Sequence, residues 1–280
     1  MKEFQIAGAT VPGTDHTMPG QPGWVNNQDA FAWRVTPDGI VAVVCDGCSS
    51  AKDSEVGAKL GVRIITDVVA MLLVDFASGI LSLSSTEEVA VSCRISMVEI
   101  LSRINDIARR VDANYKELIE SHFLFSTMCA IVTPATTMIM SCGDGVYVLN
   151  GNITTIGPYP KNAPPYLAYN LSQPNREIEF TPHVLCPTAD VQSVLIGTDG
   201  VTYLQKASEL LIPGIKPKTV EPIGDLSQFW INDAYFTDNT DIVRRKLARI
   251  NRERVVDGQI SFGPLRDDVS FITIRRTPQP

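Results

Sequence analysis

Apolar residues recur along the chain with two different spacings, and the change of spacing separates strand-forming from helix-forming regions. Between residues 4 and 46 the apolar runs are short and rich in β-branched residues, and the turn Pro37-Asp38-Gly39 separates Phe31–Val35 from Ile40–Cys45. These features predict a β-hairpin whose second, buried strand leads into Asp46-Gly47.

After Ser54, which we expect to be an N-cap, apolar residues recur every three or four positions as far as Phe76. This spacing predicts a helix of about six turns. A second helical pattern runs from Thr86 to about Ser121, and short β-rich runs separated by turns then return. We expect strands at 127–133, 136–141, 147–149, 191–197 and 269–275, a third helix at about 238–252, and a proline-rich loop at 158–174.

The order of these elements indicates an α+β protein. Strands, two helices, strands, one helix and a last strand do not alternate as βαβ units do, and the short connections favour antiparallel pairing. We therefore predict two antiparallel sheets packed face to face with helices on their outer faces, forming a single domain over residues 1–280.

Composition narrows the classes of partner. With 24 Lys and Arg against 31 Asp and Glu, the net charge is −7, which disfavours nucleic acid, and we interpret the basic segment at 244–254 as a solvated helix face. No apolar run approaches the roughly 20 residues of a membrane span, and the N-terminus lacks the apolar stretch of a signal peptide. We expect a cytoplasmic protein without a membrane partner, whose six cysteines are buried free thiols rather than zinc ligands.

Acidic turns lie at the ends of several predicted strands. They are Asn27-Gln28-Asp29, Asp46-Gly47, Asp199-Gly200 and Asp267-Asp268, with Gly143-Asp144-Gly145 before another strand. One Asp-Gly pair is most often only a turn, but carboxylates that converge repel each other unless a cation joins them. Oxygen ligands without a histidine or thiolate cluster indicate Mg²⁺ or Mn²⁺. The sequence motifs of other hydrolases and of nucleotide-binding folds are absent. Metal-assisted hydrolysis is therefore the reaction class that the sequence favours.

Six short motifs follow one another in the chain: Asn27-Gln28-Asp29-Ala30, Val44-Cys45-Asp46-Gly47, Ser126-Thr127, Cys142-Gly143-Asp144-Gly145, Gly197-Thr198-Asp199-Gly200-Val201 and Arg266-Asp267-Asp268-Val269-Ser270. In this order they resemble the protein phosphatase 2C family of metal-dependent serine/threonine phosphatases. The resemblance covers about residues 8–274 and is nearest to bacterial members, in which Pro-Pro-Tyr-Leu, here residues 164–167, follows the middle strands. It implies a four-layer α-β-β-α sandwich.

The resemblance also implies a centre of two Mn²⁺ or Mg²⁺ ions that share a bridging water. Asp46 would bridge both ions, Asp199 and Asp267 would bind the first ion, and the Gly47 carbonyl would bind the second. Asp29 would hold metal-bound waters. The four aspartates are therefore the expected catalytic residues.

Five further positions concern a third ion and the departures from the family pattern. Asp144 would contribute to a third metal site, as in bacterial members, and Asp268, where the family usually has Asn, would lie behind the ligands. Gln28 stands where many members have a metal-binding Glu, and would be a weaker ligand of the second ion. Trp24 stands where many members have the Arg that holds substrate phosphate. We therefore consider Trp24 and His16 as candidate substrate-binding residues, with His16 as a substitute for the missing Arg.

We expect an enzyme that hydrolyses phosphoserine and phosphothreonine monoesters through the metal-bridging water or hydroxide. Its partner would be a phosphoprotein that a Ser/Thr kinase phosphorylates, and the enzyme would act as a monomer. The alternative is a weak or inactive member that uses the fold for binding or sensing. The absence of Arg at position 24 favours this alternative, whereas Asp46, Asp199 and Asp267 favour the enzyme.

Overall fold

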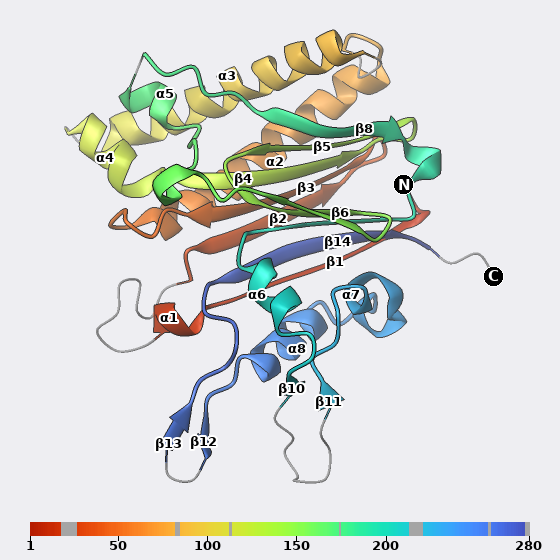
Figure 1. Ribbon diagram of the computed structural model, residues 1–280. Coiled ribbons are helices and arrows are strands. Elements are labelled where there is room, and N and C mark those ends of the chain that lie inside the picture. Colours follow the sequence, from red (N-terminus) through yellow and green to blue (C-terminus); the bar gives the residue numbers. More distant parts are fainter. Residues whose placement is uncertain are drawn as a thin grey trace.

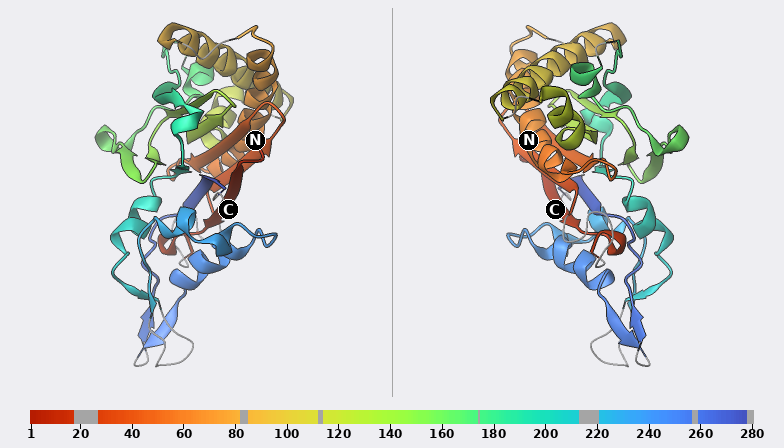
Figure 2. Two further views of the ribbon diagram at one scale, coloured as in Figure 1. Left: turned by 90° about the vertical axis from the view of Figure 1, so that its right-hand side faces the viewer. Right: turned by 90° about the vertical axis from the view of Figure 1, so that its left-hand side faces the viewer.

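A computed structural model describes residues 1–17, 27–81, 85–111, 114–173, 175–212, 221–256 and 259–277. Two five-stranded antiparallel sheets pack face to face, and helices cover the outer face of each (Figures 1 and 2). The predicted four-layer α-β-β-α sandwich is confirmed. No helix of the described ranges combines the length and apolarity that crossing a membrane requires.

The two sheets draw their strands from segments that are interleaved along the chain. The first sheet consists of β2 (Asp29–Val35), β3 (Ile40–Gly47), β4 (Phe125–Val132), β5 (Thr136–Cys142) and β8 (Thr181–Pro187), in that spatial order. The second consists of β1 (Phe4–Val11), β14 (Val269–Arg276), β9 (Ser193–Gly197), β6 (Gly145–Leu149) and β7 (Asn152–Ile156). β1 and β14, the first and last strands, pair along their full length, from Phe4 opposite Arg276 to Val11 opposite Val269.

One group of helices lies over each sheet (Figure 1). The group over the first sheet contains the two longest helices, α2 (Ser54–Ala77) and α3 (Thr86–Val111), together with α4 (Tyr115–His122) and α5 (Tyr169–Ser172). The second consists of α6 (Val201–Lys206), α7 (Gln228–Ile231) and α8 (Ile242–Ile250), and α1 (Thr14–Thr17) follows β1. Single 3₁₀ turns occupy Pro160–Asn162, Thr188–Asp190 and Asp233–Tyr235, and two small hairpins are formed by β10 (Leu211–Ile212) with β11 (Glu221–Pro222) and by β12 (Arg254–Val256) with β13 (Gln259–Ser261).

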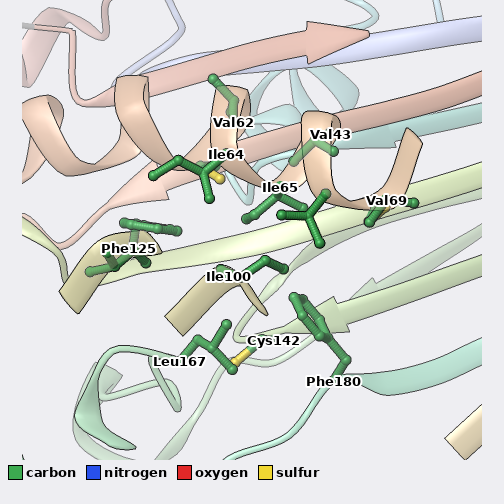
Figure 3. Close-up of a cluster of buried hydrophobic side chains, with 14 of the residues drawn as sticks. Val43, Val62, Ile64, Ile65, Val69, Ile100, Phe125, Cys142, Leu167 and Phe180 are labelled. Carbon is green, nitrogen blue, oxygen red and sulfur yellow. The ribbon is translucent and has the colours of Figure 1, made fainter. Parts of the chain in front are cut away.

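Apolar side chains fill the spaces between the layers. Val62, Ile65 and Val69 of α2 share a buried cluster with Val43 of β3 and Ile100 of α3 (Figure 3). Each fully buried aliphatic side chain of this kind contributes about 1.5–3 kcal/mol to folding. A separate buried cluster joins the inner faces of the two sheets, so the position of one sheet relative to the other is set by packing.

Three details of the predicted helices are wrong. Asp53, not Ser54, is the N-cap of α2, and Ser54 is buried inside the first turn. The pattern predicted at 86–121 belongs to two helices, α3 and α4, because apolar spacing continues across their junction and does not reveal a break. The third helix is α8, which begins later than predicted because the Asn239 side chain accepts a hydrogen bond from the Asp241 N–H (3.2 Å) and closes a turn there.

Two further sequence interpretations can be compared with the structure. All six cysteines are free thiols, as predicted, but only four are buried, since Cys48 and Cys186 are partly exposed. The proline-rich segment at 158–174 is mostly irregular, as expected, but it also contains a 3₁₀ turn and the short helix α5.

Candidate active site

The acidic turns meet at one end of the sandwich because the strands that carry them are neighbours. Asp29 opens β2 and lies directly opposite Asp46 of β3 in the antiparallel ladder. On the other sheet, Asp199 follows β9 and Asp267 precedes β14, and these two strands are also paired. Each sheet therefore contributes a pair of carboxylates.

A cavity of about 330 Å³ collects the predicted residues. All six residues proposed from the sequence as metal ligands line it, namely Gln28, Asp46, Gly47, Asp144, Asp199 and Asp267. His16 also lines the cavity, whereas Trp24 lies outside the described residues. Among the residues described, no three carboxylate, imidazole or thiol groups already stand in the geometry of a metal site. The structure thus brings the carboxylates to one cavity without converging them on a point.

Burial and mutual repulsion raise the pKa values of Asp46, Asp199 and Asp267. The pKa of Asp46 is raised well above its usual value, first by burial and then by Asp29 and Asp199. Burial and the charge of Asp267 raise the pKa of Asp199 to about 7. The pKa of Asp267 itself is also raised, mainly by burial. Ionising several neighbouring buried carboxyl groups together is unfavourable because their charges repel. A divalent cation bound among them would reduce this repulsion.

Asp29 lies behind the cavity wall and is only 2% exposed. Its Oδ2 accepts a hydrogen bond from the Thr198 hydroxyl (2.7 Å), and Oδ1 has no partner among the described residues. Buried carboxylate oxygens are rarely left in this condition. The free oxygen and the hard oxygen donors around it fit a site for hydrated Mg²⁺ or Mn²⁺.

The residues proposed for the second ion are held together by backbone contacts. The Gly47 N–H donates to the Gln28 carbonyl (3.1 Å), and the Gln28 side-chain amide donates to the Ser54 hydroxyl (3.2 Å). A Cβ at Gly47 would lie 2.8 Å from the Ser54 oxygen, so the close approach of α2 requires glycine here. Ser54, whose role the apolar spacing did not indicate, thus positions Gln28 and leaves no room for a side chain at position 47.

Asp144 is positioned by the turn between β5 and β6. Its Oδ1 accepts a hydrogen bond from the Ser126 hydroxyl of β4 (2.6 Å). Gly143 has a φ of 95°, and a Cβ there would lie 2.6 Å from Cβ of Ser126. Glycine at position 143 is therefore required by its φ and by the close contact with β4.

Asp268 is buried and fixes backbone on two sides of the cavity. Its oxygens accept hydrogen bonds from the N–H groups of Gly13 (2.7 Å) and Gln28 (2.6 Å). His16 lies against the same carboxylate, with Nδ1 2.9 Å from Asp268 Oδ2 and Nε2 3.6 Å from Asp267 Oδ1. Interaction with Asp268 raises the pKa of His16. The family resemblance implies that Asp268 lies behind the ligands, but it does not predict the contacts of Asp268 with Gly13, Gln28 and His16.

Sequence reasoning assigned no role in the site to eight residues of the cavity wall. Four of them line it from the proline-rich loop, namely Lys161, Asn162, Pro164 and Tyr166, and the others are Cys48, Ser49, Ser50 and Ser126. The Pro-Pro-Tyr-Leu segment, which contains Tyr166, indicates a resemblance to bacterial members but no role in the site. No motif marks Lys161.

Comparison with known proteins agrees with this geometry. The sequence model of the family described as protein phosphatase 2C matches residues 13–230, and the chain belongs to this family. A sequence search of curated proteins gives no match.

Solved structures show the same fold at low sequence identity. A bacterial serine phosphatase is 15% identical with a TM-score of 0.51, the alignment covering 99% of both chains. The serine/threonine phosphatase Stp1 from Staphylococcus aureus is 16% identical with a TM-score of 0.50 over 98% of this chain and 96% of that one. The catalytic domain of the serine/threonine phosphatase PstP, in complex with two manganese ions, is 11% identical with a TM-score of 0.50 over 98% and 99%.

Proposed function

We propose that this protein is a metal-dependent phosphatase that hydrolyses phosphoserine and phosphothreonine monoesters, with two Mn²⁺ or Mg²⁺ ions, and a third in the same acidic cavity. The main support is the shared cavity of Asp46, Asp144, Asp199 and Asp267, which come from both sheets. Membership of the protein phosphatase 2C family and the serine/threonine phosphatases that share the fold support the reaction class.

In this proposal Asp46 would hold both ions, Asp199 and Asp267 would hold the first, and the Gly47 carbonyl and Gln28 would hold the second. Divalent ions held there supply Lewis acidity, which lowers the pKa of water and offsets charge on the phosphoryl group. The protein positions its donors in advance, since backbone and hydroxyl contacts hold Gly47 and Gln28 in place.

Residues behind the ligands have separate tasks. The free Oδ1 of Asp29 accepts a hydrogen bond from water and orients it, while the Thr198 hydroxyl fixes the other oxygen. Ser126 orients Asp144, which with Asp199 would hold the third ion. His16 is proposed to contact substrate phosphate, and Trp24, the other residue predicted at that phosphate, lies outside the described residues.

We further propose a phosphoprotein substrate that is phosphorylated by a Ser/Thr kinase, and a cytoplasmic, monomeric protein with one domain over residues 1–280. The alternative, a weak or inactive member used for binding or sensing, is favoured by the neutral amide of Gln28 where a carboxylate would hold the second ion more strongly.

The deciding experiment is hydrolysis of an aryl phosphate and of a phosphothreonine peptide, with Mn²⁺ and with a chelator. We expect turnover with Mn²⁺, its loss with the chelator, and a decrease in kcat of about 10³-fold or more in Asp46→Asn, since electrostatic stabilisation of this size is typical of such sites. Full activity after exhaustive metal removal would refute the mechanism. Metal binding measured by calorimetry without any turnover would instead identify the binding module.

A further inference from the structure

The wall of the cavity is strongly acidic. Asp46, Asp144, Asp199 and Asp267 line it, and Asp29 lies directly behind. Ionised carboxylates repel a phosphate monoester dianion that enters the cavity. A cation that the protein supplies at the edge of the cavity would therefore favour the binding of phosphate.

His16 is poorly suited to be the sole source of that charge. Its ring lies within 3.6 Å of Asp267 and 2.9 Å of Asp268, so any positive charge on it is already balanced by two carboxylates. The phosphate would have to compete with both.

Lys161 has no such competition. In the part of the chain that the structure describes, it is the one lysine or arginine that lines the cavity. No Asp or Glu of the described residues forms an ion pair with it, whereas Lys246 and Arg249 each pair with Glu221. Its side chain is exposed, so the ammonium can reach a ligand from the solvent side.

The backbone at Lys161 is held in a conformation that L residues avoid. Lys161 and Asn162 have φ values of 60° and 50°, in the left-handed region. The turn is closed by hydrogen bonds from the Asn162 N–H to the Tyr159 carbonyl (3.0 Å) and from the Ala163 N–H to the Pro160 carbonyl (3.3 Å). Glycine adopts this conformation without strain, yet two residues with side chains occupy it. Strain of this kind is typical of ligand-binding loops.

We propose that the Lys161 ammonium binds the phosphate group of the substrate at the solvent-exposed wall of the cavity and offsets the repulsion between that phosphate and the acidic residues. This inference rests on the proposed function, because it assigns a role in the same cavity. It makes Lys161 a substrate-binding residue, and it gives the proline-rich loop the task of holding that residue in place.

The test is equilibrium binding of inorganic phosphate to the Mg²⁺-loaded full chain, measured by calorimetry. Lys161→Met should raise the dissociation constant about five- to tenfold, the size of one solvent-screened charge-assisted contact, and Lys161→Arg should stay within about twofold of the wild type. Lys161→Gly removes the charge and the strained φ together. It should bind phosphate as weakly as Lys161→Met and melt no lower than the wild type, which separates a charge effect from a folding defect.

Lys52→Met is the matched control. Lys52 lies in a neighbouring groove that shares only Ser50 with the cavity, so its loss should leave phosphate binding unchanged. Unchanged binding in both Lys161→Met and Lys161→Gly would overturn the proposal, as would an equal loss in Lys52→Met.

Aryl phosphate kinetics separate this inference from the proposed function. With metal-dependent turnover, Lys161→Met should raise KM by a factor similar to the rise in the phosphate dissociation constant. Turnover with KM and phosphate binding both unchanged in the variant would refute Lys161 alone. Weaker phosphate binding in the variant, in a protein without turnover, would support the role of Lys161 and refute the proposed enzyme.

Discussion

The carboxylate of Asp268 accepts a hydrogen bond from the backbone N–H of Gln28, 240 residues earlier in the chain, at 2.6 Å. Its other oxygen accepts from the Gly13 N–H at 2.7 Å. The buried side chain of Asp268 thus binds both Gly13, in the segment after β1, and Gln28, immediately before β2. The place of Gln28 in the cavity therefore depends on the far end of the chain.

The first prediction concerns this double acceptor. In Asp268→Asn one oxygen becomes an NH₂ group, which would face a backbone N–H and leave it without an acceptor. We expect a loss of about 1–3 kcal/mol in the free energy of unfolding, measured in urea. Asp106→Asn, an exposed change on α3, should stay within about 0.5 kcal/mol of the wild type. Wild-type stability in Asp268→Asn would show that these two hydrogen bonds are not formed in solution.

The second prediction concerns the stability of the metal-free protein. Because the pKa of Asp199 is raised to about 7 by burial and by Asp267, its ionised form opposes folding. This penalty is absent below about pH 4, grows as the pH rises towards 7, and is complete above that. Asp199→Asn should therefore raise Tm in chelator by at least about 2 °C at pH 8 and by less at pH 5.

The same variant should lose the increase in Tm that Mn²⁺ gives the wild type, because a ligand of the first ion is gone. Differential scanning calorimetry with and without the metal measures both effects. A lower Tm for Asp199→Asn in chelator at pH 8 would contradict the assigned repulsion.

The third prediction concerns Gln28, which is 4% exposed and donates to the Ser54 hydroxyl. A glutamate cannot donate this bond and adds a buried charge, so Gln28→Glu should destabilise the metal-free protein by about 1–3 kcal/mol. It should also lower the Mn²⁺ concentration needed for half-maximal activity, because a carboxylate binds the second ion more strongly. Gln28→Ala, which removes the oxygen, should raise that concentration. An unchanged or higher requirement in Gln28→Glu would place residue 28 away from the ion.

The fourth prediction concerns thiol reactivity. Only Cys48 and Cys186 are partly exposed, while burial raises the pKa of Cys93 to about 11 and raises that of Cys129 further. An aromatic disulfide reagent should therefore titrate two thiols in the native protein and six after denaturation.

Cys48 lines the cavity and Cys186 does not, so Mg²⁺ with phosphate should slow the modification of Cys48 alone. Peptide mapping after timed labelling distinguishes the two thiols. Equal protection of both, or rapid labelling of Cys93, would contradict the described cavity and burial.

Local patterns account for the parts of the fold and site that the sequence predicts. The three-to-four spacing after Ser54 reflects the face of α2 that packs on the sheet, and it is readable because one helix carries the whole pattern. Asp46 and Asp199 were identifiable because each stands next to a glycine at the end of an apolar strand. Such signals extend over only a few residues.

The remaining features depend on contacts between distant segments. The hydrogen bond between Asp268 and Gln28 leaves no trace in the residues around either one. Lys161 lines the cavity because of the conformation of the proline-rich loop. The composition of this loop predicts that it is irregular but does not predict its conformation. The break between α3 and α4 is hidden because apolar spacing continues past it.

The pairing of β1 with β14 has a consequence for how the protein is made. β1 is synthesised well before its partner strand, so it stays an unpaired edge until residues 12–268, which separate the two strands, have been made. Long-range pairing of this kind slows folding and exposes strand edges to aggregation. Asp267 and Asp268 immediately precede β14, so the cavity cannot be completed before this segment has emerged, and any metal uptake that needs Asp267 must follow it.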